Sequence, residues 1–213
     1  MEDLYIWHNE IIGKRTVESL KKNGFQAAYF SDKEEAAQYV LSLIPKNNSV
    51  GVAGSATTKS LKILVELKNR GNQILDHNDP SLSEEEKNQV RLQQQTCDVF
   101  LTSSNAVTLD GKLVNMDGIG NRVAAMTFCP KKVIIVVGVN KIVSNLDLAL
   151  DRIQTTASPI NNKRLDRPNP CVKTGICVDC QAPTRICNIL NIIYKRPFLT
   201  DITVIVIGEN LGY

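Results

Sequence analysis

The stretch Val133-Ile-Ile-Val-Val-Gly-Val139 is the longest wholly apolar run in the chain. It has no polar alternation, as is expected of a strand whose two faces are both covered by helices. Other short apolar or β-branched runs share this character: Gln26 to Phe30, Ser49 to Ala53, Val99 to Thr102 and Ile202 to Ile207. Together these runs predict a mostly parallel sheet buried between helical layers.

Segments with helical periodicity lie between these runs. An N-terminal helix carries Leu4, Trp7 and Ile11 on one side. Three later helices are predicted from N-terminal capping signals, in which a serine is followed three residues later by an acidic residue. These pairs are Ser31 with Glu34, Ser83 with Glu86, and Ser144 with Asp147. Strands that alternate with helices in this way are typical of a three-layer αβα architecture.

The composition fits one domain that spans residues 1–213. Hydrophobic residues make up 43% and charged residues 22%, which is typical of a globular protein. The net charge of +3 comes from scattered lysines, so nucleic-acid binding is not predicted. The longest apolar run is too short to cross a bilayer, and the acidic start Met1-Glu-Asp-Leu4 does not resemble a signal peptide. We therefore expect a cytoplasmic protein with no membrane partner.

A first candidate ligand loop, Gly51-Val-Ala-Gly-Ser-Ala-Thr-Thr58, follows a predicted strand. It precedes a predicted helix that contains Leu61, Leu64 and Val65. Unpaired N–H groups and the helix dipole favour an anion at such a position. The residues predicted to hold the anion are Gly51, Gly54, Ser55, Thr57 and Thr58. A plain turn capped by Ser55 or Thr57 is the alternative. The glycine fingerprints of NAD and ATP sites are absent, so neither cofactor is predicted.

A second candidate ligand loop is Asp117-Gly-Ile-Gly-Asn-Arg122. It follows a short hairpin that turns at Asp110-Gly111, and it opens a helix. Arg122 is suited to bidentate contact with a carboxylate or phosphate, and Asp117 is the candidate general base. A turn with a solvated arginine is the alternative. Further residues predicted at the ligand are Ser104, Asn105, Gly118, Gly120 and Asn121.

The two histidines are too few to support a Ser-His-Asp or Cys-His arrangement. His8 lies in a polar part of the first helix and is expected at the surface. His77 follows a short strand and is consistent with either a loop or a site.

The polar, Pro- and Cys-rich stretch 158–188 has little periodicity and predicts an insertion loop. It contains four cysteines with the spacing C-x5-C-x2-C-x6-C, which are Cys171, Cys177, Cys180 and Cys187. Four thiolates suit zinc or an iron–sulfur cluster, and the spacing alone does not separate the two. Free thiols are the alternative. Cys97 and Cys129 stand alone beside apolar neighbours and are expected to be buried structural cysteines.

The run from Ser104 to Ala124 resembles the signature of the LUD (lactate-utilisation) domain. Other matching stretches are Pro130 to Val143, Pro170 to Cys180, Arg185 to Asn188 and Gly208 to Tyr213. The resemblance implies the fold shared by ribose-5-phosphate isomerase, glucosamine-6-phosphate deaminase and CoA transferases, in which the loop matching 51–58 grips phosphate. Ala53 and Ala56 interrupt the glycine and hydroxyl pattern of the isomerases, so no catalytic carboxylate is transferred from those enzymes.

Three functions are open at this point. The first is a redox-associated protein, for which the resemblance implies iron–sulfur partner subunits, that binds a small carboxylate or phosphorylated ligand between loops 51–58 and 117–122. The second is an isomerase or transferase that acts on a sugar phosphate or acyl-CoA, with a purely structural metal. The third is a non-catalytic ligand-binding or scaffold subunit. Assembly as a homo-oligomer is compatible with all three.

Overall fold

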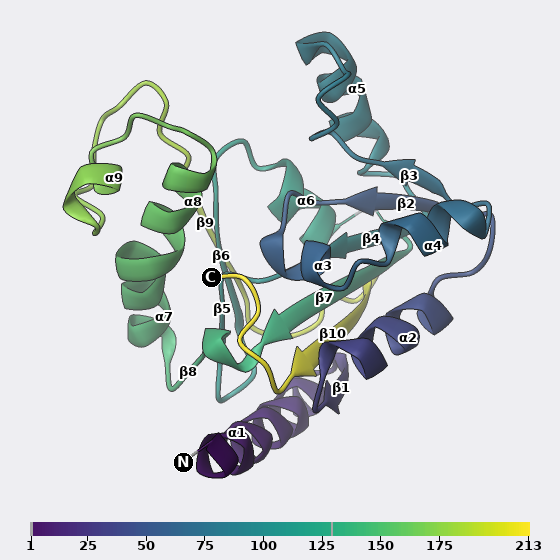
Figure 1. Ribbon diagram of the computed structural model, residues 1–213, viewed down its shortest axis with the longest axis vertical. Helices are drawn as coiled ribbons and strands as arrows, with labels where there is room; N and C mark the ends of the chain where they lie inside the picture. Colours follow the sequence, from purple (N-terminus) through teal and green to yellow (C-terminus); the bar gives the residue numbers. More distant parts are fainter. Residues whose placement is uncertain (1, 129) are drawn as a thin grey trace.

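The computed structural model describes residues 2–128 and 130–213 (Figure 1). Its centre is a six-stranded sheet in which all neighbouring strands are parallel. In spatial order the strands are β1 (Gln26–Phe30), β10 (Asp201–Ile207), β7 (Lys132–Gly138), β4 (Val99–Thr102), β2 (Ser49–Val52) and β3 (Gln73–Leu75). The predicted parallel α/β sheet is confirmed.

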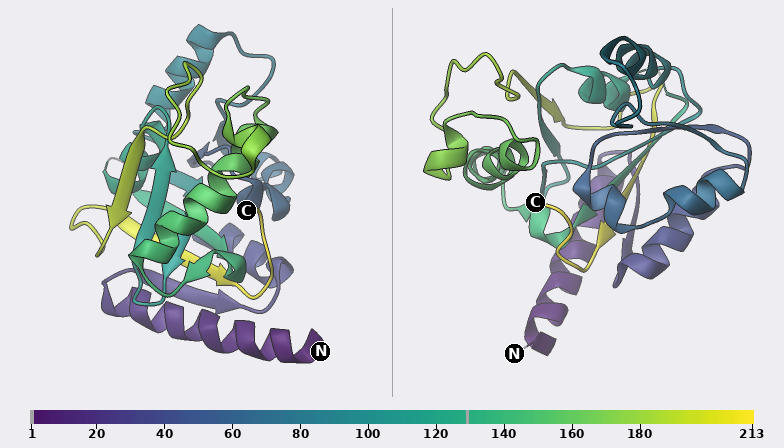
Figure 2. Two further views of the ribbon diagram at one scale, coloured as in Figure 1. Left: turned by 90° about the vertical axis from the view of Figure 1, so that its left-hand side faces the viewer. Right: turned by 45° about the horizontal axis from the view of Figure 1, so that its top comes forward.

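Helices cover both faces of this sheet, which confirms the layered architecture (Figures 1 and 2). Alternate residues of β7 point to opposite faces: Ile134 joins the core under one helical layer, and Ile135 joins the core under the other. One face is covered by α2 (Lys33–Leu43), α3 (Ala56–Ser60) and α4 (Leu64–Asn69), and the other by α1 (Glu2–Lys22) and α6 (Asn121–Thr127).

A second, four-stranded sheet packs on the same side as α1. Its strands, in spatial order, are β8 (Ile142–Val143), β5 (Ala106–Thr108), β6 (Leu113–Asp117) and β9 (Ile189–Ile193). The antiparallel pair β5–β6 is the hairpin predicted at Asp110-Gly111, where Gly111 has a φ of 83°. Strand β9 was not predicted. Helix α7 (Leu146–Arg152) covers this sheet through Ala149, which packs with Ala106 and Val114.

The predicted capping box at Ser83 and Glu86 is confirmed at the start of α5 (Glu84–Gln93). The other two helix starts are displaced by one residue. Asp32, and not Ser31, accepts the N–H of Glu35 at the start of α2. Asn145, and not Ser144, caps α7. In both places a serine precedes a second strong capping residue, and the second one is used.

The prediction of a single helix after the glycine loop is wrong, because the helix is interrupted between α3 and α4. Lys62 adopts a left-handed φ of 54° at the break. This kink allows Leu61 and Ile63 on either side to be buried together under the α2 layer. Val65, in the second of these helices, is exposed.

The stretch 158–188 is partly helical. It contains α8 (Ser158–Arg164), which continues from α7 through the π-helical turn η2 (Ile153–Ala157), and the short α9 (Cys171–Thr174). Pro159 lies in the first turn of α8, where a missing N–H is tolerated. The predicted insertion loop therefore holds only for the residues outside these two helices.

Helix α1 is present as predicted, but its first half extends past the sheet (Figure 2). Leu4, Trp7 and Ile11 are 65%, 60% and 50% exposed, whereas Val17 and Leu20 near its end enter the core. His8 is exposed, as predicted. None of the described helices is long and apolar enough to span a bilayer.

Candidate functional site

A cavity of about 290 Å³ lies at the carboxyl edge of the central sheet. Residues that directly follow β2, β3, β4 and β7 line it, and the clearest examples are Gly54, His77, Ser103 and Lys141. The carboxyl ends of parallel strands meet at one edge, which is where open α/β sheets bind their ligands. The cavity therefore has the position expected of a ligand site in this architecture.

Both predicted ligand loops face this cavity. Nine of the residues predicted at the ligand line it: Gly54, Ser55, Thr57, Ser104, Asn105, Asp117, Gly118, Asn121 and Arg122. The structure thus brings together segments that are more than fifty residues apart in the sequence, as the prediction of a shared cleft requires.

Three other predicted residues have structural roles outside the cavity lining. Gly51 lies inside β2, where a Cβ atom would come within 3.0 Å of Cys97 Sγ. The Thr58 N–H donates to Ser55 Oγ over 3.2 Å, so this pair caps α3, as the alternative of a plain capped turn expects. Gly120 precedes α6 with a φ of 98°, a conformation that favours glycine.

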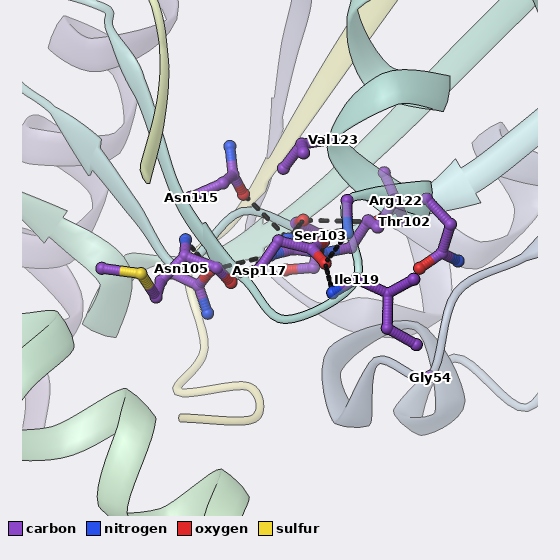
Figure 3. Close-up of polar contacts among 12 residues, drawn as sticks. Gly54, Thr102, Ser103, Asn105, Asn115, Asp117, Ile119, Arg122 and Val123 are labelled. Carbon is purple, nitrogen blue, oxygen red and sulfur yellow. Dashed lines mark hydrogen bonds and ion pairs between the residues drawn. The ribbon is translucent and has the colours of Figure 1, made fainter. Parts of the chain in front are cut away.

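The Arg122 side chain is 19% exposed, and its guanidinium uses all five of its N–H donors within the protein (Figure 3). Its acceptors are Asp117 Oδ2 at 3.2 Å, Ser103 O at 3.2 Å, Asn115 Oδ1 at 2.9 Å, Asn105 Oδ1 at 3.0 Å and Met116 O at 2.8 Å. The predicted bidentate contact with a ligand has no donor left to use. Arg122 instead ties the loop after β4 to strand β6.

Asp117 is turned toward its own loop. One carboxylate oxygen accepts the N–H groups of Ile119 at 3.2 Å and Gly120 at 2.9 Å, and the other accepts Arg122 Nε. The residue is 8% exposed. Burial of this carboxylate is therefore compensated by an ion pair and two backbone donors. Its role as a general base stays a prediction.

Lys141, which was not predicted, is the most unusual charged residue of the site. It ends the 3-10 turn η1 (Val139–Lys141) directly after β7 and is only 4% exposed. Its Nζ donates to Thr57 Oγ1 over 2.7 Å and to Ser103 Oγ over 3.1 Å. Burial, assisted by the charges of Arg152 and Arg122, lowers the pKa of Lys141 to about 7. Among the described residues, no carboxylate forms an ion pair with this amine.

Three arginines from the helical layer and the adjoining loop extend the positive lining: Arg91 of α5, Arg164 of α8 and Arg167. Arg164 Nη2 donates to Gly54 O over 3.2 Å and so joins α8 to the glycine loop. Arg91 Nε is buried without a hydrogen-bond partner in the described part of the chain. With Arg122, these arginines give the cavity four guanidinium groups, and Lys141 adds a fifth basic side chain.

His77 lies in the loop after β3 and lines the cavity. It is half-buried, and its Nδ1 lies 3.0 Å from Gln94 Oε1. Burial is the largest influence and lowers the pKa of His77 below its ordinary value. The imidazole is therefore mainly neutral near pH 7.

The four clustered cysteines lie within electrostatic reach of one another. The pKa of the Cys171 thiol is raised by burial and then by Cys187, Cys180 and Cys177. Their thiols are chemically suitable metal ligands, but among the described residues no three side chains form a group that could hold a metal ion. Metal binding therefore stays a prediction. Cys97 is buried, as predicted, and Cys129 lies outside the described residues.

The C-terminal segment braces the cavity from one side. In Figure 1 it passes between α8 and α3. Thr57 Oγ1 donates to Leu211 O over 3.1 Å, and Tyr213 Oη accepts Arg164 Nε over 2.6 Å. Gly212 has a φ of 64°, and a Cβ atom there would come within 2.5 Å of Thr57 Oγ1. Glycine is therefore required at position 212 for the backbone to pass this close to Thr57.

Comparison with known proteins gives one family match and a set of similar folds. The model of the LUD domain matches residues 13–207. A DUF162 family protein from Deinococcus radiodurans is similar in structure, with a TM-score of 0.54 and 15% identity over 94% of this chain and 98% of that chain. eIF2B beta from Chaetomium thermophilum gives a TM-score of 0.39 and 14% identity over 55% of this chain and 44% of that chain. No curated protein matches the sequence.

Proposed function

This chain belongs to the LUD domain family, and we propose that it binds a small anionic metabolite, a carboxylate or a phosphorylated compound, in the cavity at the carboxyl edge of its sheet. One observation carries the proposal. The described lining contains four guanidinium groups and a single carboxylate side chain, and that carboxylate, Asp117, is already paired with Arg122. A ligand of opposite charge would balance the excess positive charge.

The donors that remain for a ligand differ from those predicted. Arg122 is fully used by the protein, so recognition of the anion is assigned to the arginines at the cavity rim. Arg167 is exposed and lines the cavity, which places its guanidinium where it can meet an anion without rearrangement of the core. The cavity volume of about 290 Å³ suits a small metabolite and is too small to enclose a whole coenzyme A molecule.

The test is a thermal-shift and calorimetric screen at low salt with inorganic phosphate, lactate, ribose 5-phosphate and acetyl-CoA. We expect at least one anion to raise the melting temperature, with an affinity that falls as salt is added. Arg167→Gln should weaken that binding by about tenfold, the loss of one charge-assisted hydrogen bond. Lys163→Gln removes the same charge from an exposed residue outside the cavity lining and should leave binding unchanged.

Binding that is equally weakened by both substitutions would show that general charge, and not this cavity, attracts the anion. A complete absence of shifts across the screen would remove the proposed function.

A redox role is the second candidate function, and the position of the cysteine segment favours it. Ile186 lines the cavity and Cys187 follows it directly, so a metal held by the four thiols would lie beside the ligand site. Such a metal would supply either electron transfer, as an iron–sulfur cluster, or structural support, as zinc.

Anaerobic purification followed by metal analysis and visible absorption separates these outcomes. We expect stoichiometric metal in the wild-type chain and its loss in the double variant Cys177→Ala/Cys180→Ala. Cys97→Ala, a buried cysteine outside the segment, is the control and should retain the metal. A reducible chromophore would support the redox role, and a colourless zinc protein would assign the segment a structural one. Protein with neither metal nor charge-transfer absorbance would contradict metal binding altogether.

A further inference from the structure

The hydrogen bonds around Lys141 define the state of its amine. Thr57 Oγ1 donates its proton to Leu211 O over 3.1 Å, and Ser103 Oγ donates to Ser104 O over 3.3 Å. A hydroxyl group has one proton to donate, so both hydroxyls must accept from Lys141 Nζ. The nitrogen is bonded to Cε and has three further tetrahedral positions. N–H groups that donate to these hydroxyls occupy two of them, and the third is left open.

A neutral amine fits this arrangement better than an ammonium ion. The neutral form satisfies both hydroxyls with its two hydrogens and keeps a lone pair at the third position, whereas an ammonium would place a third hydrogen there. The described structure offers that third hydrogen no acceptor. Burial favours the neutral form most, and the guanidinium groups of Arg152 and Arg122 add to this preference because they repel a further cation.

Lys141 also has access to a substrate, because it lines the cavity in which we propose that an anion binds. A buried lysine kept neutral by desolvation and by neighbouring cations is an activated nitrogen nucleophile that attacks carbonyl carbon. The hydrogen bonds to Thr57 and Ser103 fix the position of the nitrogen. Its lone pair therefore has one orientation, because the lysine side chain does not change rotamer freely.

We propose that Lys141 is a nucleophile that forms an imine with a small aldehyde or ketone bearing a phosphate or carboxylate group. The proposal rests on the proposed anion-binding function, since the rim arginines would hold the anionic group while the carbonyl faces Nζ. The nitrogen lone pair forms a bond to the carbonyl carbon, and the carbonyl π pair moves to oxygen, which takes one of the two amine protons. The resulting carbinolamine loses its hydroxyl group together with the second amine proton as water, and the C=N bond forms. No oxidant, reductant or further reactant is needed.

The test is reductive trapping of the wild-type chain with sodium borohydride, in separate reactions with dihydroxyacetone phosphate and with pyruvate. A trapped imine raises the protein mass by that of the carbonyl compound less one oxygen atom. Peptide mass spectrometry then locates the adduct. We expect a single adduct on Lys141 with at least one of the two compounds, saturating with its concentration and suppressed by excess inorganic phosphate. The two compounds distinguish phosphorylated from carboxylate substrates.

Two variants provide the controls. Lys141→Met should abolish the adduct, and Lys131→Met, at a lysine whose side chain is 79% exposed, should leave it unchanged. Because the adduct is located on the wild-type chain, the result does not depend on whether Lys141→Met folds.

Each outcome has a defined meaning. An adduct spread over several exposed lysines, or none at all while dihydroxyacetone phosphate and pyruvate still bind by calorimetry, would overturn the imine proposal and leave the anion-binding function intact. If neither carbonyl compound, phosphate nor any other anion binds, the proposed function fails as well.

Discussion

Arg122 and Lys141 are basic side chains of the same cavity, and their surroundings differ in kind. Arg122 is surrounded by acceptors for all five donors, one of them the carboxylate of Asp117. Lys141 has two hydroxyl acceptors and no carboxylate. The first residue therefore fixes the architecture of the site, and the second is left chemically available. This difference leads to two predictions about single residues.

Arg122→Gln should destabilise the protein by about 3 kcal/mol or more, because it leaves the buried carboxylate of Asp117 and several loop oxygens without their partner. Urea unfolding measures this change in the free energy of unfolding. Arg167→Gln, at an exposed arginine, should change it by about 0.5 kcal/mol or less. An Arg122 variant as stable as the wild type would show that the guanidinium network contributes nothing to the fold.

Lys141 should make the stability depend on pH in a defined window. Its pKa is about 7 in the folded protein against an ordinary value of 10.5, so between these values the unfolded chain binds more protons than the folded one. The free energy of unfolding therefore rises with pH across this window, by a few kcal/mol at most, and the contribution is flat below about pH 7. Comparison of wild-type protein and Lys141→Met by urea unfolding at pH 7 and pH 9.5 isolates it. If the free energies of unfolding of the two proteins differ by the same amount at both pH values, the lowered pKa of Lys141 is contradicted.

Among the elements, the C-terminal segment shows how a backbone position controls a side chain in the site. Gly212 and Gly175 both have positive φ angles, of 64° and 76°. A Cβ atom at Gly212 would meet Thr57 Oγ1 at 2.5 Å, whereas one at Gly175 would meet nothing within 4 Å. Thr57 in turn accepts from Lys141.

Gly212→Ala should therefore weaken anion binding by about tenfold in addition to a backbone cost of about 1 kcal/mol. Gly175→Ala should carry the same backbone cost and leave binding unchanged. Calorimetric titration with the anion identified in the screen, together with urea unfolding, measures both quantities. If the two variants behave alike, the segment after β10 has no part in the site.

The predictability of each element depends on whether its signal is local. The buried strands were predicted because a strand covered on both faces must be apolar throughout. The kink at Lys62 and the strand β9 were not, since each depends on packing partners distant in sequence. The two predicted loops do share a cavity. Sequence alone could not show that oxygens from two distant segments, 103–105 and 115–117, would accept all the Arg122 donors, or that Lys141 would contact Thr57. Lys141 had one local signal, its position directly after the longest apolar run.

For the molecule as a whole, the exposed first half of α1 indicates self-association. Leu4, Tyr5, Ile6 and Trp7 are between 57% and 67% exposed on consecutive positions, which is unusual for a helix that ends in the core. We expect a homo-oligomer whose interface includes this segment. Trp7 is the only tryptophan, so its fluorescence emission should shift to the red on dilution as the oligomer dissociates.

Size-exclusion chromatography with light scattering over a range of concentrations checks the assembly. Trp7→Lys should shift the chain toward the monomer, and Val65→Lys, at an isolated apolar residue that is 69% exposed, should not. A wild-type chain that is monomeric at every concentration would contradict the expectation.

The position of β10 in the central sheet has a consequence for synthesis. This strand lies between β7 and β1, and it is the only neighbour of β1 in that sheet. While the ribosome is still adding the residues before Asp201, β1 has no partner in this sheet, and once β7 has been made its adjacent edge remains open as well. The nascent chain therefore carries an unpaired β1 for most of its translation and a second open edge for the last part of it. Pairings of such long separation also form slowly. Nascent chains of this protein should therefore depend on chaperones until β10 has emerged from the exit tunnel.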